Sequence, residues 1–252
     1  MSTSELVSII TPAFRAARFV GDSIRSAVAQ DYPNWEMLIV DDCSPDDTAE
    51  RVDEWVKRES RVRLIRQPQN GGPAAARNAA LASSSGRYAA FLDSDDFWLP
   101  QKLTRQLEFM RTNGAAISFT GFRRISEDGG QIGRLLTVPE RLTYAQLLGN
   151  TAIATSTVIV DRSLTGPLQM RHVYYDDFVL WLSLLRRGHV AFGMNEDLMR
   201  YRVVGKSVSR NKTKSAREVW KTYRNVEELG LFRSAWCFLN YSTRGWLKYA
   251  RF

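Results

Sequence analysis

The stretch VSIITPAFRAARFVGDSIRSAVAQDYPNWEMLIVDD, residues 7–42, decides the fold class because it reads as strand, helix and strand. Residues 6–12 are a short β-branched run that is typical of a buried strand. Residues 19–30 place Val20, Ile24 and Val28 on one face of a helix, and residues 35–42 form a second strand. Two strands joined through a helix indicate a βαβ unit of a parallel sheet.

The alternation continues as far as residue 98. Residues 44–59 predict a helix with Ser44 as its cap, Pro45 in its first position and an acidic first turn. The next predicted elements are a strand, a helix and a strand at 61–67, 72–83 and 86–93. We therefore expect an α/β fold with a mostly parallel sheet flanked by helices. In such a sheet, ligands bind outside the carboxyl ends of the strands.

The second half of the chain has a looser pattern of helices at 100–114 and 176–188 and strands at 115–126, 155–160 and 197–204. We predict one catalytic domain over residues 1–207, with a first part at about 1–98 and a second part at about 99–207. A basic, aromatic-rich helical extension follows at 208–252.

The amino-acid composition indicates the class of protein to which the chain belongs. The 252 residues are 44% hydrophobic, which suits a soluble globular enzyme. Cys43 and Cys237 lie far apart, and no signal-like segment is seen, so we expect a reducing, cytoplasmic setting. No run approaches the roughly 18 apolar residues that a membrane-spanning helix needs.

The net charge of +8 is concentrated in the tail, where residues 200–252 hold thirteen Lys and Arg against three Glu. Residues 233–252 mix aromatic and basic side chains, which suits a helix that lies in an anionic membrane interface. Alternatively, the aromatic side chains pack on the catalytic domain. No recognised DNA or RNA module accompanies the charge, so we expect no nucleic-acid partner.

An acidic cluster follows the fourth predicted strand, in YAAFLDSDDFWLP, residues 88–100. Asp93 and Asp95 are two residues apart, so that their carboxylates can point to the same side of an extended segment. Such oxygen ligands suit Mg²⁺ or Mn²⁺. Alternatively, these residues cap the next helix or belong to its solvated first turn, where Asp96 is also expected.

Neighbouring loops supply what a nucleoside diphosphate requires. Asp41 and Asp42 end the second strand, where a carboxylate can accept hydrogen bonds from a ribose hydroxyl or from the N–H of uracil. Phe14 can stack on a base, and Arg77 can meet phosphates or carboxylates in a fork geometry. An alternative role for Arg77 is a structural ion pair with an aspartate. The chain lacks both a P-loop and the dinucleotide fingerprint, which leaves phosphate charge to a metal.

Four segments in order, VSIITPAFRAARFVGDSIRSAVAQDYPNWEMLIVDDCSPDDT, NGGPAAARNAAL, GRYAAFLDSDD and DDFVLWLSLLRRG, resemble the family 2 glycosyltransferases of GT-A fold. The resemblance covers roughly residues 6–210 and is closest to bacterial enzymes of the teichuronic acid, capsule and O-antigen type. It implies an inverting, Mn²⁺- or Mg²⁺-dependent transfer of a sugar from a nucleotide donor, expected to be UDP-linked. The implied acceptor is a lipid-linked saccharide at the inner face of the cell membrane.

The resemblance also implies that residues 1–98 or so are the nucleotide-sugar half of the domain and about 99–207 its acceptor half, and it assigns roles to individual residues. Thr11, Pro12 and Phe14 would line the base. Asp41 and Asp42 would hold the nucleoside, with Arg77 beside them. Asp93 and Asp95 would form the metal-binding DxD element, in which Asp93 also lies near the ribose.

On the acceptor side, Asp177 matches the general base of the family, and Asp176 matches its acidic neighbour. Alternatively, both are first-turn acids favoured by the helix dipole. Many relatives carry a metal-binding histidine where this chain has Val204, and Lys206 is expected to contact the diphosphate.

Two other functions deserve comparison. A sugar-phosphate nucleotidyltransferase usually needs a glycine-rich loop after its first strand, and this chain has TPAFRAA there. A non-catalytic nucleotide-binding module recruited to the membrane would not need the acidic pairs at 93/95 and 176/177.

Overall fold

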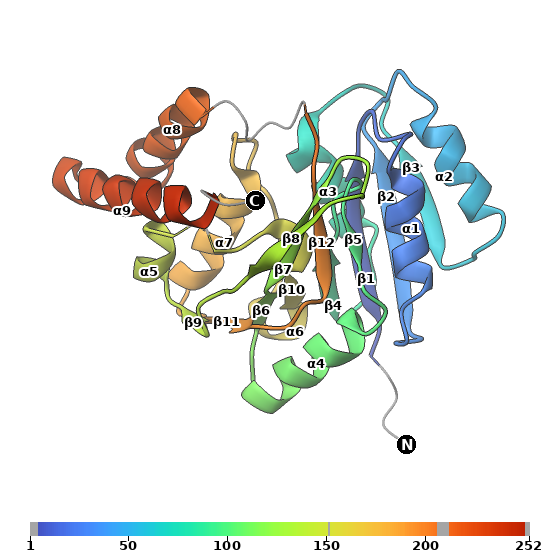
Figure 1. The fold of residues 1–252 in the computed structure, drawn as a ribbon, viewed down its shortest axis with the longest axis horizontal. Helices are drawn as coiled ribbons and strands as arrows, with labels where there is room; N and C mark the ends of the chain where they lie inside the picture. Colours follow the sequence, from blue (N-terminus) through green and yellow to red (C-terminus); the bar gives the residue numbers. More distant parts are fainter. Residues whose placement is uncertain (1–4, 151, 206–211, 250–252) are drawn as a thin grey trace.

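The computed structural model describes residues 5–150, 152–205 and 212–249, which form two sheets with helices around them (Figure 1). The larger sheet has eight strands in the order β3-β2-β1-β4-β10-β6-β11-β9. Their bounds, in that order, are Val62–Arg66, Trp35–Asp41, Val7–Ala13, Tyr88–Phe91, Ile159–Asp161, Ile117–Thr120, Ala191–Met194 and Arg141–Leu142.

The first four strands are parallel, as the alternation of the sequence predicts. Their side chains alternate between two apolar layers, because successive residues of a strand face opposite sides of the sheet. Ile10 and Leu38 pack in the layer that holds α3 (Gly72–Ala82), α5 (Tyr144–Leu148) and α7 (Asp176–Arg186). Ile9 and Met37 pack in the opposite layer, with α1 (Val20–Val28), α2 (Thr48–Val56) and α4 (Lys102–Asn113). The sheet is therefore buried on both faces.

The predicted start of the second helix is wrong. The helix α2 begins at Thr48, and Ser44 does not cap it. The hydroxyl groups of Ser44 and Thr48 instead accept hydrogen bonds from the backbone N–H groups of Arg15 and Ala16, at 3.0 and 2.8 Å. These two side chains tie the loop after β2 to the loop after β1, and the helix starts only after that connection.

The strand predicted over 115–126 is also wrong, because the chain changes sheets at Gly121. Residues 117–120 form β6 of the large sheet, and β7 (Phe122–Ser126) belongs to a four-stranded sheet in the order β5-β12-β7-β8. A side chain at position 121 would lie 3.1 Å from the carbonyl oxygen of Leu136, so the close approach of this strand favours glycine.

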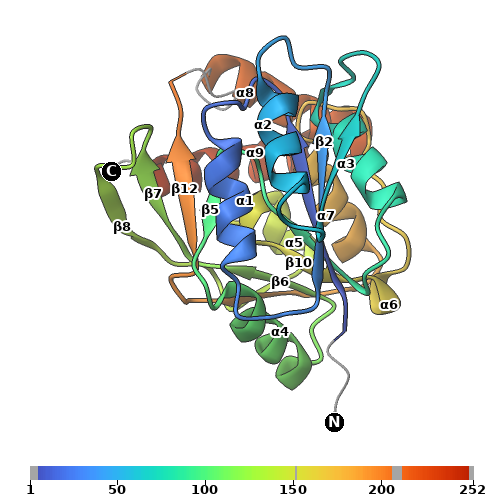
Figure 2. The same ribbon diagram turned by 90° about the vertical axis from the view of Figure 1, so that its right-hand side faces the viewer.

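The small sheet comprises β5 (Phe97–Trp98), β12 (Met199–Val203), β7 and β8 (Ile132–Leu136), and it stands beside α1 (Figure 2). Its existence was not predicted. The strand β12 pairs with β5, which directly follows the acidic cluster, so residues 199–203 lie close to that cluster. In the large sheet, β10 runs antiparallel to both of its neighbours, so the sheet is mixed beyond β4.

The remaining segments of the acceptor half are short. They are the 3₁₀ turn η1 (Thr155–Thr157), within the predicted strand 155–160, and α6 (Arg162–Thr165).

The predicted C-terminal extension is helical. It consists of α8 (Lys212–Lys221), a π-helical turn η3 (Thr222–Val226) and α9 (Leu231–Tyr249). The buried Tyr223 donates a hydrogen bond to the carbonyl oxygen of Leu148, and the rings of Trp220 and Phe238 meet edge to face at 5.8 Å. The extension is thus packed on α5 and α7. Across the described ranges, no helix combines the length and the apolar character that crossing a bilayer requires.

Candidate active site

The candidate site begins at the carboxyl ends of β1 and β2, which are neighbours in the sheet. Thr11 Oγ1 and Asp41 Oδ1 are buried there and have no hydrogen-bond partner within the described part of the chain. Asp41 Oδ2 accepts a hydrogen bond from the backbone N–H of Ser44 at 3.2 Å. Because buried polar atoms are nearly always paired in folded proteins, these two free atoms indicate a place for a polar ligand.

Asp42 has a different environment from Asp41. Its two carboxylate oxygens accept hydrogen bonds from the backbone N–H groups of Gly71 and Gly72, each at 2.8 Å. Gly72 has a φ of 81°, a conformation that glycine adopts without steric cost. Asp42 therefore fixes the loop that leads into α3, and α3 carries Arg77.

Both loops that follow the first two strands contain backbone strain. Arg15 has a φ of 53° and Cys43 a φ of 58°, which is the left-handed region that non-glycine residues rarely adopt. Such outliers persist where the surrounding structure holds them, often at ligand sites. Pro12 lies in β1, just before the first of these loops, and Phe14 lies in that loop, where it is 44% exposed with the Arg15 guanidinium 5.2 Å from its ring centre.

Arg77 connects the donor and acceptor sides of the site. Its Nη2 donates a hydrogen bond to Asp93 Oδ1 at 2.6 Å, and its Nη1 donates one to Asp176 Oδ2 at 2.9 Å. The guanidinium is buried. Burial alone would lower its pKa, but the charges of Asp93 and Asp176 outweigh burial and raise the pKa above the usual value. Arg77 is thus a permanent cation that holds two carboxylates of the site.

The three carboxylates of the turn after β4, those of Asp93, Asp95 and Asp96, have different surroundings. Burial, followed by repulsion from Asp93, raises the pKa of Asp95 to about 6. Asp96 is buried and accepts hydrogen bonds from Ser156 Oγ at 2.6 Å and from the backbone N–H of Arg202 at 2.9 Å. Burial also raises the pKa of Asp96, with further repulsion from Asp95. Asp96 holds the turn in place through these hydrogen bonds. The carboxylates of Asp93 and Asp95 are the ones available to a ligand.

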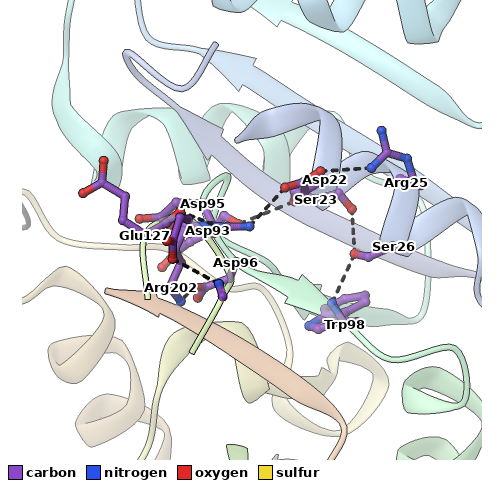
Figure 3. Close-up of polar contacts among 12 residues, drawn as sticks. Asp22, Ser23, Arg25, Ser26, Asp93, Asp95, Asp96, Trp98, Glu127 and Arg202 are labelled. Atoms are coloured by element: carbon purple, nitrogen blue, oxygen red, sulfur yellow. Dashed lines mark hydrogen bonds and ion pairs between the residues drawn. The ribbon is translucent and has the colours of Figure 1, made fainter. Parts of the chain in front are cut away.

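Arg202 also contributes to the site, and sequence reasoning did not find it. Its Nε donates to the carbonyl oxygen of Asp95 and its Nη1 to that of Glu127, both at 2.9 Å, and its Nη2 lies 3.1 Å from Asp22 Oδ2 (Figure 3). The side chain is only 5% exposed. Arg202 therefore joins the acidic turn to the β7–β8 hairpin and to α1. The sequence signal for it is weak, because β12 also carries Arg200.

The two aspartates at the start of α7 point in different directions, as expected for adjacent helical residues. Asp176 is buried against Arg77, and burial raises its pKa although the Arg77 charge opposes this. Asp177 is half-buried and accepts hydrogen bonds from Thr155 Oγ1 at 2.5 Å and from the backbone N–H of Phe178 at 2.7 Å. Of the two carboxylates, Asp177 is the more accessible.

The carboxylates of the turn fit a divalent cation. In the described ranges, no group of three or more His, Cys, Asp or Glu side chains is arranged to hold a metal. Mg²⁺ and Mn²⁺ sites, however, commonly use one or two carboxylates with substrate phosphates. A cation would relieve the repulsion between Asp93 and Asp95 that raises the pKa of Asp95. Val204 follows β12, and Lys206 lies outside the described residues, so its predicted contact with the diphosphate stays a prediction.

Comparison with known proteins identifies the family. The model of glycosyl transferase family 2 matches residues 8–165, which include every strand of the donor site. The chain belongs to this family. It is 44% identical over 238 residues to the putative teichuronic acid biosynthesis glycosyltransferase TuaG of Bacillus subtilis, covering 94% of each chain. It is 36% identical over 246 residues to the UDP-Glc:alpha-D-GlcNAc-diphosphoundecaprenol beta-1,3-glucosyltransferase WfgD of Escherichia coli, covering 97% of this chain and 95% of the relative.

Solved structures show the same GT-A fold. S. aureus TarS 1–349 in complex with UDP-GlcNAc superposes with a TM-score of 0.71 at 17% identity, over 96% of this chain and 73% of that one. The mannosyltransferase PcManGT of Pyrobaculum calidifontis, in complex with GDP-Man and Mn²⁺, also gives a TM-score of 0.71 at 16% identity, over 96% and 74%. The chain is thus a family 2 glycosyltransferase.

Proposed function

We propose that this glycosyltransferase inverts the anomeric configuration of a sugar as it moves it from a UDP donor to a lipid-linked saccharide. The observation that carries the proposal is the Arg77 bridge, because it places the donor-side Asp93 and the acceptor-side Asp176 on one guanidinium. The relative WfgD, a UDP-Glc:alpha-D-GlcNAc-diphosphoundecaprenol beta-1,3-glucosyltransferase, supports the choice of acceptor. The reaction would take place at the inner face of the cell membrane.

The nucleoside would be held at the ends of β1 and β2. Asp41 Oδ1 is the free buried acceptor there and suits the N–H of uracil, and Thr11 Oγ1 can bond to the nucleoside beside it. The exposed ring of Phe14 would stack on the base, next to Pro12. Asp42 would act indirectly, because both of its carboxylate oxygens already hold the loop of α3.

Asp95 and Asp93 would hold the Mn²⁺ or Mg²⁺ ion at the diphosphate. When bound, the cation stabilises the negative charge that develops on the departing UDP. Arg77 orients Asp93 for this role through the 2.6 Å hydrogen bond. Asp96 would only position the turn, because its side chain is buried and Ser156 and Arg202 hold its oxygens, whereas Asp177 is half-buried.

Asp177 would act as the general base. Its carboxylate accepts the proton of the acceptor hydroxyl as that oxygen attacks the anomeric carbon, and the bond from that carbon to the diphosphate oxygen breaks. Attack from the face opposite UDP inverts the anomeric configuration. The hydrogen bond from Thr155 at 2.5 Å fixes the Asp177 side chain for this step, and the Arg77–Asp176 pair fixes the first turn of α7 that carries it.

The proposal is tested by thermal-shift measurements with a panel of UDP-, GDP- and dTDP-sugars, with and without Mn²⁺. The best donor is then incubated with a polyprenyl diphosphate-linked saccharide. We expect Mn²⁺-dependent protection by UDP-sugars and a product of inverted configuration. Release of pyrophosphate from a nucleoside triphosphate and a sugar phosphate would instead identify a nucleotidyltransferase. Binding without turnover across a broad acceptor panel would favour a non-catalytic module.

A further inference from the structure

The helix α9 has one face that packs on the catalytic domain. Ser234 and Cys237 are buried, and Phe238 and Tyr241 pack against the apolar layer under α7. The rings of Tyr241 and Phe178 lie 6.1 Å apart. Phe178 directly follows Asp177 in α7. The helix is therefore coupled mechanically to the segment that carries the proposed base.

The opposite face of α9 is apolar and exposed. Leu231, Phe232, Trp236 and Leu239 are 59%, 92%, 67% and 58% exposed, respectively. With about 100° of rotation per residue, these four positions fall within roughly 140° of the helix circumference. They make up half of the large hydrophobic side chains that are exposed among the described residues. We call this set the outer face of α9.

Positive charge borders the outer face. Arg233 and Arg244 are exposed near its two ends, on the same edge of the helix. Over the sequence of the described extension, residues 212–249, eight Lys and Arg stand against three Glu. One of these acids, Glu227, is buried and paired with Arg186, so it does not offset the surface charge. A helix with an apolar face and a cationic edge matches the charge and polarity of an anionic lipid surface.

We propose that the outer face of α9 lies in the headgroup region of an anionic bilayer, with the helix axis along the membrane plane. The inference rests on the proposed function, because a lipid-linked acceptor presents its diphosphate at that surface. Since Tyr241 packs on Phe178, a membrane-bound α9 sets the height of Asp177 above the bilayer. The surface would thus bring the base to the level of the acceptor saccharide.

A bilayer fits the outer face better than a second copy of the chain does. In a two-fold dimer the same patch faces itself, which would bring Arg233 and Arg244 of two copies together. Like charges at the edge of such an interface oppose association, whereas anionic headgroups attract both arginines. The charge pattern therefore selects lipid as the occupant.

The test is co-sedimentation of the full-length protein with vesicles of phosphatidylglycerol and phosphatidylcholine, and with vesicles of phosphatidylcholine alone. The variants are F232S/W236S on the outer face and R233E/R244E on its edge. Ile132→Ser with Leu164→Ser is the matched control, because these side chains are 60% and 52% exposed and lie outside α9. Melting temperature and light scattering report the fold and the oligomeric state of each variant. Turnover is measured with a water-soluble short-chain acceptor.

We expect wild type and the I132S/L164S control to bind phosphatidylglycerol vesicles, with binding weakened by salt. The F232S/W236S variant should partition at least about tenfold less, and R233E/R244E should lose its preference for anionic lipid. Turnover of the soluble acceptor should stay at the wild-type level in both. Unchanged vesicle binding by F232S/W236S, absent binding by wild type, or a dimer that F232S/W236S dissociates would overturn the proposal. Normal turnover in these cases would leave the proposed function intact.

Discussion

Arg77 donates a hydrogen bond to Asp176 across 99 residues of sequence, at 2.9 Å, and a second one to Asp93 at 2.6 Å. One buried cation therefore holds an acid from each side of the site. The pairing distinguishes the two neighbouring acids: Asp176 is bound to Arg77, whereas Asp177 accepts hydrogen bonds from Thr155 and Phe178.

Replacement of Arg77 by Met should destabilise the protein by about 3–5 kcal/mol, because it leaves two carboxylates without their cation. Arg77→Lys should also lose most activity, since a single ammonium cannot present two parallel donors in the geometry of a guanidinium. Urea denaturation and turnover report the two effects. Arg63→Lys is the control, because this arginine is half exposed on β3. Activity of R77K close to that of wild type would refute the bridging role.

Asp95 predicts how metal binding depends on pH. Only the ionised carboxylate binds a cation, and burial together with Asp93 raises the pKa of Asp95 to about 6. The apparent Mn²⁺ affinity measured with UDP should therefore be constant above pH 7 and fall by about tenfold per unit below pH 6. D95N should remove the Mn²⁺-dependent thermal protection by UDP, and D53N on α2 should not. Equal protection of wild type and D95N would exclude Asp95 as a ligand.

Arg202 should control metal affinity without touching the metal. In R202M the carbonyl oxygen of Asp95 loses its donor, so the acidic turn loosens and the apparent Mn²⁺ affinity should fall by about tenfold. R202K should restore part of the affinity, because one ammonium can reach one carbonyl. The control is Arg105→Met on α4, where the side chain is about half exposed. A lower melting temperature with normal Mn²⁺ affinity would assign Arg202 a structural role only.

Lys102 lies in the core, away from the site, and it predicts how the free energy of unfolding depends on pH. Its Nζ is buried, has no hydrogen-bond partner among the residues described, and lies 3.9 Å from the ring centre of Trp98. Burial lowers its pKa well below the ordinary value. As the pH falls, the unfolded chain therefore takes up this proton before the folded chain does. The free energy of unfolding falls as the pH drops below about 10.4.

K102M should therefore raise the free energy of unfolding at pH 7 by about 1 kcal/mol or more, with less pH dependence between pH 7 and 10. Urea titrations at several pH values, with exposed Lys57→Met as the control, measure both. Destabilisation by K102M would mean that the folded protein retains the charge of Lys102.

The sequence predicted the parallel donor half because its signals are local. The strands β1, β2 and β4 are short, largely apolar runs, and β3 mixes apolar residues with Arg63 and Arg66. Each of the four is followed by a polar loop at the site. Asp93 and Asp95 could be singled out because they follow the fourth strand, and Asp176 and Asp177 because their segment resembles an acidic motif of the family.

The contacts that organise these residues could not be predicted, since they join distant segments. Arg202 reaches Asp95 across 107 positions, and Asp42 reaches Gly72 across 30. The small sheet depends on the change of direction at Gly121, where the strand pattern runs on without interruption. The two faces of α9 explain why the sequence allowed two interpretations of the tail. Phe238 packs against the core, whereas Trp236 is exposed to solvent.

The central claim is that Asp177 is the base in transfer from a UDP-sugar to a lipid-linked saccharide. The most direct test compares single-turnover transfer by wild type and D177N, with UDP affinity measured alongside. We predict that D177N binds UDP with unchanged affinity and transfers at least about 100-fold more slowly, as expected for loss of a general base. Transfer by D177N at close to the wild-type rate would contradict the account.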